Sequence, residues 1–158
     1  MKLWQKDKAS LQEVEKFTVG NDREMDMYLA SFDVLGSLAH IEMLASVDLL
    51  TKEELTQLQQ ELKSIYKQIQ NGEFTLQDDV EDIHSQIELL LTKKLGDVGK
   101  KIHSARSRND QVLVDVKLFL RNELEELVKT IQPFFELLQT QSEKYKADLL
   151  PGYTHLQL

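Results

Sequence analysis

The sequence contains no cysteine, only two prolines and only six glycines among its 158 residues. The absence of cysteine excludes a disulfide framework and a thiolate metal site, and it fits a cytoplasmic protein. Because proline and glycine interrupt helices, their scarcity predicts long helices. No apolar run approaches the roughly 18 residues of a membrane-spanning helix, and the first residues lack the apolar core of a signal peptide. We therefore expect a soluble, helical protein without a membrane partner.

Positive charge is also scarce, because 27 acidic residues against 19 Lys and Arg give a net charge of −8. This balance disfavours a nucleic-acid partner, since binding to phosphates needs a broad basic face. Basic residues nevertheless gather between positions 93 and 108, where Asp97 is the only acid. They are Lys93, Lys94, Lys100, Lys101, Arg106 and Arg108. An acidic protein that gathers its positive charge in one place suggests an anion-binding site there.

Local signals predict where the first helices begin and end. Asn21 with Glu24, and Thr51 with Glu54, form two capping patterns, each of which opens a predicted helix. The first helix is expected to run to about residue 49, and the second ends at Gly72, where glycine tolerates the left-handed conformation. Residues 1–20 are expected to form an irregular arm. The arm has one amphipathic turn, around Leu11, Val14 and Phe17.

A third helix is expected after Asp82, because acids favour a helix N-terminus, and it should end near residue 95. Residues 96–99 read as a flexible loop. After Asn109, apolar residues recur every three or four positions for about forty residues. Pro133 lies inside this pattern and should kink the helix rather than end it.

Apolar spacing predicts the buried face of each helix. In the first helix the stripe is Met25, Leu29, Phe32, Leu35, Leu38, Ile41 and Ala45; in the second it is Leu55, Leu58, Leu62, Ile65 and Ile69. The third helix contributes Ile83, Ile87, Leu90 and Leu91. We predict an all-α fold, with a small helical domain over 1–105 and a long helix that opens the segment 106–158.

The start of the long helix concentrates groups that bind anions. Arg106 and Arg108 offer planar donor forks that match a carboxylate, and Asn109 adds neutral hydrogen bonds. A helix N-terminus also directs free N–H groups outward. The alternative is a helix start capped by Ser or Asn, with solvated basic residues around it. The chemistry alone leaves both interpretations open.

The stretch Ser-Arg-Asn-Asp-Gln at 107–111 resembles the first signature region of the argininosuccinate lyase family, within the fumarase/aspartase superfamily. Three further stretches agree with the family in order: Lys-Leu-Trp at 2–4, Glu-Asp-Ile-His at 81–84 and Gly-Tyr-Thr-His-Leu-Gln at 152–157. The resemblance covers essentially the whole chain. It implies that the long helix is the first helix of the superfamily's central bundle.

The family cleaves argininosuccinate to arginine and fumarate by β-elimination, in arginine biosynthesis, as a homotetramer and without a cofactor. The resemblance therefore implies a carbon–nitrogen lyase with argininosuccinate as its small-molecule substrate. Two alternatives stay open. One is another fumarate-releasing enzyme of the adenylosuccinate lyase kind, against which Arg108 argues. The other is a non-enzymatic helical scaffold like the delta-crystallins.

The resemblance also assigns residues to roles. Ser107, Arg108 and Asn109 would bind the substrate. The last motif would supply Thr154 and Gln157 for substrate binding, and His155 as the catalytic acid or base. A histidine suits that role because its pKa lies near neutrality.

His84 has two interpretations. The matching histidine of the family contacts a substrate carboxylate, whereas the residues alone also allow a helix-surface histidine that neutralises nearby acids. His40 and His103 are expected to be structural. Because the histidines are dispersed and cysteine is absent, we expect no metal site.

The sequence departs from the family in two places. A substrate-binding serine usually follows the position of Thr18, but residues 19–22 read Val-Gly-Asn-Asp in a segment two residues longer. Whether Asn21 replaces that serine stays open. The family's third signature, a Gly-Ser-Ser loop with the catalytic serine, would lie beyond Leu158. We therefore expect the N-terminal portion of an enzyme, inactive alone and self-associating through its apolar stripe.

Asn109 and His155 flank the predicted long helix, which spans about 60 Å at 1.5 Å per residue. A substrate about 10–15 Å long cannot reach both ends of such a helix. If both residues touch the substrate, Asn109 of one subunit must meet His155 of another. The resemblance to tetrameric enzymes agrees with such shared sites.

Overall fold

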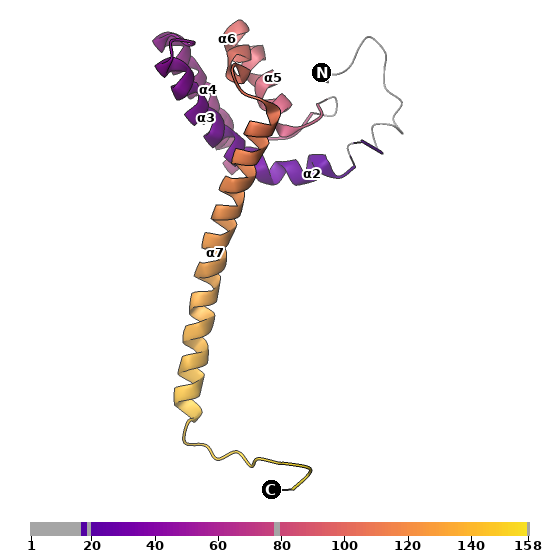
Figure 1. Cartoon of the computed structure of the whole chain (residues 1–158), viewed down its shortest axis with the longest axis vertical. Helices are drawn as coiled ribbons and strands as arrows, with labels where there is room; N and C mark the ends of the chain where they lie inside the picture. Colours follow the sequence, from indigo (N-terminus) through magenta and orange to yellow (C-terminus); the bar gives the residue numbers. More distant parts are fainter. Residues whose placement is uncertain (1–16, 19, 78–79, 158) are drawn as a thin grey trace. The chain divides into compact units, whose positions relative to one another are not determined.

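The computed structural model describes residues 17–18, 20–77 and 80–157 (Figure 1). These residues form α-helices and two short 3₁₀ helices, with no strand among them, so the all-α prediction is confirmed. None of the described helices is long and apolar enough to cross a membrane. The Lys-Leu-Trp stretch at 2–4 and the expected turn at Leu11 and Val14 lie outside the described residues.

The chain divides into two compact units between Phe119 and Leu120. The expected boundary after residue 105 stays a prediction. In the first unit, α2 (Asp22–Asp26) is followed by a 3₁₀ helix (Met27–Leu29) and by α3 (Ala30–Ser46). The single helix expected up to residue 49 is therefore wrong. Asn21 does precede α2, but its side chain makes no capping hydrogen bond, so the capping box expected there is also wrong.

The second predicted helix is confirmed as α4 (Lys52–Gln70), and so is its capping box. The backbone N–H of Glu54 donates to Thr51 Oγ1 at 3.2 Å, and the N–H of Thr51 donates to Glu54 Oε2 at 3.0 Å. Gly72 follows the helix with a φ of +71°, as expected of a glycine that ends a helix.

The third predicted helix is α5 (Ile83–Leu95), and Asp82 caps it by accepting from the N–H of Ser85 at 2.7 Å. The flexible loop expected at 96–99 is wrong, because α6 (Asp97–Lys100) begins there, and a 3₁₀ helix (Lys101–His103) follows it. Gly99 lets α6 lie directly on α5, since a Cβ at this position would stand 2.4 Å from the carbonyl carbon of Leu91. Backbone contact this close is open only to glycine.

The core of the first unit lies between α3, α4 and α5, and Figure 1 shows α3 and α4 side by side. The predicted faces of α4 and α5 are confirmed, with Leu58, Leu62, Ile65, Ile83, Ile87 and Leu91 buried. The stripe predicted for the first helix is wrong in part. Met25 and Leu35 are 58% and 41% exposed, whereas Asp33 and Ser37 are fully buried beside Val34.

The predicted long helix is confirmed as α7 (Arg108–Tyr145), whose 38 residues continue through Pro133. Its first turns, up to Phe119, belong to the first unit. There Phe119 packs edge-on against Phe32 of α3 with ring centroids 5.9 Å apart, and Gln111 and Asp115 are buried. In the second unit α7 is exposed along its length, including its large apolar side chains. These include Leu124, Val128, Ile131, Phe134 and Leu138.

Candidate active site

The start of α7 is held by a closed ring of hydrogen bonds between Ser107 and Asp110. Ser107 Oγ accepts from the N–H of Asp110 at 3.2 Å and donates to Asp110 Oδ2 at 2.7 Å, and the N–H of Ser107 donates to the same carboxylate at 3.0 Å. Hydrogen bonds from the Ser107 side chain and backbone lower the pKa of Asp110. Ser107 is therefore the N-cap of α7, and Asn109 lies exposed in the first turn. Substrate binding by these residues stays a prediction.

Arg108 connects the start of α7 to the start of α5. Its Nη2 donates to Ser85 Oγ at 3.1 Å, and its Nε lies 3.7 Å from Asp82 Oδ2. These two contacts orient the guanidinium, and about a quarter of the arginine side chain stays exposed. The structure thus brings two of the sequence-predicted residues, Arg108 and His84, to the same end of α5.

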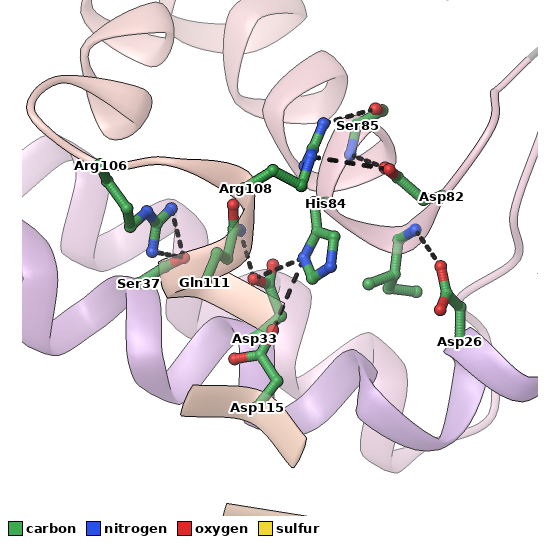
Figure 2. Close-up of polar contacts among 11 residues, drawn as sticks. Asp26, Asp33, Ser37, Asp82, His84, Ser85, Arg106, Arg108, Gln111 and Asp115 are labelled. Carbon is green, nitrogen blue, oxygen red and sulfur yellow. Dashed lines mark hydrogen bonds and ion pairs between the residues drawn. The ribbon is translucent and has the colours of Figure 1, made fainter. Parts of the chain in front are cut away.

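A buried polar cluster lies behind this surface. It consists of Asp33, His84, Gln111 and Asp115, with Arg106 beside it (Figure 2). His84 Nδ1 lies 2.9 Å from Asp33 Oδ1 and 3.6 Å from Asp115 Oδ2, and Gln111 Nε2 also donates to Asp33 Oδ1. His84 is only 3% exposed, so the interpretation as a helix-surface histidine is wrong.

Arg106 borders the cluster from the segment before α7. Its two terminal nitrogens both donate to Ser37 Oγ at 3.3 Å. Burial lowers the pKa of Arg106, and the charges of Asp33 and Asp115 oppose that effect. His40, one of the two histidines expected to be structural, accordingly ties α3 to this segment, with its Nε2 2.8 Å from the carbonyl oxygen of Ser104.

The cluster retains protons near neutral pH. Burial and the neighbouring charge of Asp33 raise the pKa of Asp115 to about 7, against the smaller effects of His84 and Arg106. Burial acts to lower the pKa of His84. The hydrogen bond and the charge of Asp33, together with the charge of Asp82, outweigh burial, so the pKa of His84 is raised. The surroundings of His84 therefore favour the imidazolium form more than water does.

The sequence patterns did not indicate Asp33, Ser37 or Asp115 as site residues, and they placed Gln111 only within the motif at 107–111. A signal existed, because each helix carries two polar residues four positions apart, which places them on one face. On α3 that face is buried, although the predicted buried stripe did not include it.

Among the described residues, the group of side chains that could hold a metal ion is Asp33, His84 and Asp115, whose ligand atoms lie within 4.8 Å of one another. The residues do not fit a metal well. The Nδ1 atom that would bind the ion is already hydrogen-bonded to Asp33, and Arg106 supplies positive charge to both carboxylates. A ligating histidine must also be neutral, whereas the surroundings of His84 favour its protonated form.

A cavity of about 250 Å³ adjoins His84 in the first unit. It is lined by Thr18, Asp22, Met25, Asp26, Glu81, Asp82, His84 and Val112. Asp26 accepts from the backbone N–H of Ile83 at 3.3 Å, and burial raises its pKa. An acidic wall that includes one histidine suits a ligand bearing a cationic group together with an anionic one.

The second unit contains the last motif. Thr154 and Gln157 exchange backbone hydrogen bonds of 2.8 and 3.0 Å. Between them His155 and Leu156 have φ angles of +52° and +65°. Two consecutive residues in this left-handed region make a tight turn that non-glycine residues seldom adopt. His155 is exposed at the tip of this turn, and a group that contacts a ligand must be exposed. Strained backbone of this kind also clusters at functional sites.

The fold and these sites define a helical protein. The motif at 107–111 forms the polar start of its long helix, and the motif at 152–157 places His155 on a tight turn. Residues 5–158 match the lyase family, and the chain belongs to it. Over 157 residues the chain is 60% identical to the argininosuccinate lyases of Bacteroides thetaiotaomicron and Bacteroides fragilis, which covers 99% of this chain and 35% of each relative. It is 42% identical over 161 residues to the argininosuccinate lyase of Alkaliphilus metalliredigens. The chain thus spans about a third of the length of these relatives, and the resemblance inferred from the motifs is confirmed.

Proposed function

We propose that this chain is the N-terminal part of an argininosuccinate lyase, an enzyme of arginine biosynthesis that works in the cytoplasm without a cofactor. The observation that carries this proposal is the 60% identity to argininosuccinate lyases across almost the whole chain, which includes both substrate motifs. The geometry agrees, because the start of α7 leaves Asn109 exposed and Arg108 about a quarter exposed in an otherwise acidic protein.

The reaction requires hydrogen-bond donors that are held in position before the substrate reacts. A base removes a proton from the carbon beside a carboxylate, the electron pair moves to form the double bond of fumarate, and the carbon–nitrogen bond to the guanidinium breaks. A proton delivered to the leaving nitrogen completes arginine. Negative charge builds on the carboxylate in the transition state, so preorganised donors stabilise it most. Ser107, Arg108 and Asn109 would supply them.

The second motif would supply the proton-transfer chemistry. His155 stands at the tip of its turn with Thr154 and Gln157 at the base, so the turn gathers all three residues in one place. His84 would reach the substrate from the wall of the acidic cavity.

We further propose that each active site is shared between subunits. Helix α7 has 38 residues, which corresponds to about 57 Å at 1.5 Å per residue. Asn109 lies in its first turn and His155 follows its end in the sequence, while the substrate is only about 10–15 Å long. A homotetramer in which α7 packs into a common bundle would bring the two motifs together. It would also cover the apolar side chains exposed on α7.

The test uses a full-length protein of the relatives' size that carries this chain. Fumarate release from argininosuccinate, and not from adenylosuccinate, is the expected result. A matched His155→Asn variant controls for contaminating activity. Cleavage of adenylosuccinate alone would reassign the substrate, and a folded protein that cleaves neither compound would favour a scaffold.

A further inference from the structure

His84 lies between the buried polar cluster and the acidic cavity. Its Nδ1 faces Asp33 and Asp115, and His84 also lines the cavity together with Asp26 and Asp82. Figure 2 shows the second ring nitrogen on the side away from the two carboxylates. Because the two nitrogens lie on different edges of the ring, whatever binds Nδ1 also decides where Nε2 points.

Three helices contribute one side chain each to this contact: Asp33 from α3, His84 from α5 and Asp115 from α7. The Asp33 carboxylate is itself held in place. Gln111 donates to Asp33, and Arg106 binds Ser37, one turn beyond Asp33. Both oxygens of Asp115 are buried without a hydrogen-bond partner among the described residues. Buried oxygens without a hydrogen bond cost free energy, unless they interact with a neighbouring charged group.

We infer that Asp33 and Asp115 are positioning residues for His84, which hold a hydrogen on its Nδ1 and thereby aim its Nε2 into the cavity as the atom that meets substrate. This inference rests on the proposed function only for the identity of the substrate. The tautomer and orientation of His84 are properties of this chain that can be measured without any activity.

Charged groups surround His84 on every element packed against it. Asp26 faces it from α2, Asp33 from α3, Asp82 from the cap of α5, and Asp115 and Arg108 from α7. Arg106 faces the two carboxylates of the cluster. Burial and Arg108 act to lower the pKa of His84, whereas Asp33 and Asp82 act to raise it, and the net effect is a raised pKa. A protonated ring offers Nε2–H as a donor to a substrate carboxylate.

The first experiment is ¹⁵N NMR of the histidine rings of this chain. With four histidines in all, a His84→Gln variant identifies the signal of His84. The wild type is expected to show a protonated, slowly exchanging Nδ1. A bare Nδ1 would overturn the inference without any variant. So would a stoichiometric transition metal in the purified protein, since a ligating Nδ1 cannot carry a hydrogen.

Variants then test the two carboxylates. Asp33→Asn is expected to lower the pKa of His84 by about one unit or more, because it removes the charge that the ring faces. Asp22→Asn, which neutralises another acid of the cavity wall, is the matched control and should leave that pKa nearly unchanged. Asp115→Asn should resemble the wild type below about pH 6 and differ from it above pH 7, where Asp115 of the wild type ionises. Equal shifts in the Asp33 and Asp22 variants would overturn the inference.

The second experiment is a double-mutant cycle in the full-length protein. Asp33→Asn and His84→Gln should each raise KM about tenfold with a smaller change in kcat. The double variant should be no worse than His84→Gln, because Asp33 acts through His84. Independent, multiplying effects would overturn the inference. A protein inactive on argininosuccinate would refute the proposed function, and the NMR experiment would then still decide the positioning role.

Discussion

Nδ1 of His84 lies 2.9 Å from Oδ1 of Asp33, although 51 residues separate the two in the sequence. The pair is completed by Asp115, from a third helix. A buried histidine between two carboxylates links protonation to folding, because its charge state differs between the folded and unfolded chain.

The pH dependence of stability should change in an Asp115→Asn variant. Burial raises the pKa of Asp115 to about 7, so the folded state favours the protonated acid. The stability that this proton provides is lost as the pH rises from about 4 through 7. The variant keeps a neutral side chain at every pH. Between pH 5 and pH 8, its free energy of unfolding should therefore rise by at least about 1 kcal/mol relative to that of the wild type.

Urea unfolding of both proteins at pH 5 and pH 8 measures this difference. Burial lowers the pKa of His40, so its contribution to stability increases as the pH rises. Both proteins contain His40, and its contribution cancels in the difference between them. Parallel stability curves for the two proteins would contradict the prediction.

Gly99→Ala should destabilise the first unit by about 1–3 kcal/mol or more, the usual cost of overpacking. The added Cβ would stand 2.4 Å from backbone atoms of Leu91, which cannot turn aside as a side chain can. Gly152→Ala is the matched control, since nothing lies within 4 Å of a Cβ there. Thermal unfolding measures both, and an equal change in the two variants would show that α6 does not depend on this contact.

Thr51→Ala should cost about 0.5–2 kcal/mol, the usual effect of removing an N-cap. Asn21→Ala precedes a helix in the same way but should cost much less, because the Asn21 side chain makes no capping bond. Chemical unfolding of the two variants gives the comparison. A larger loss in the Asn21 variant would indicate that Asn21 has another role.

In the full-length protein, Asn109→Ala should cost about 1–3 kcal/mol of transition-state stabilisation, because a donor that bound substrate would bury is lost without a substitute. His155→Asn should lower kcat by about a hundredfold or more, the usual effect of losing an acid or base. Near-normal turnover in either variant would mean that its residue has a different role.

Mixed oligomers of these two variants test the shared site. If Asn109 and His155 of each site come from different subunits, some sites of a mixed oligomer receive both intact residues, and part of the activity should return. The measurement is fumarate release after the two inactive proteins are unfolded and refolded together. Oligomers of each variant refolded alone are the control, and a complete absence of rescue would rule out shared sites.

Several structural features were predictable because the interactions that make them are short in sequence. The capping box of Thr51 and Glu54 closes over three residues, and Gly72 ends its helix through its own backbone freedom. The 38-residue length of α7 follows from a steady apolar spacing that Pro133 does not interrupt. The substrate motifs at 107–111 and 152–157 were recognised for the same reason, and their roles stay predictions.

The sequence by itself determined helices α4, α5 and α7, most of their ends and the family. Only the tertiary structure decided which face of α3 is buried and where Gly99 brings two backbones together. It also decided that Asp33, His84 and Asp115 meet in one cluster. The physical reason is that a helix pattern reports apolar burial, whereas the burial of a charged residue depends on a partner from another helix. That partner is specified only when α3, α5 and α7 pack together, which no local spacing encodes.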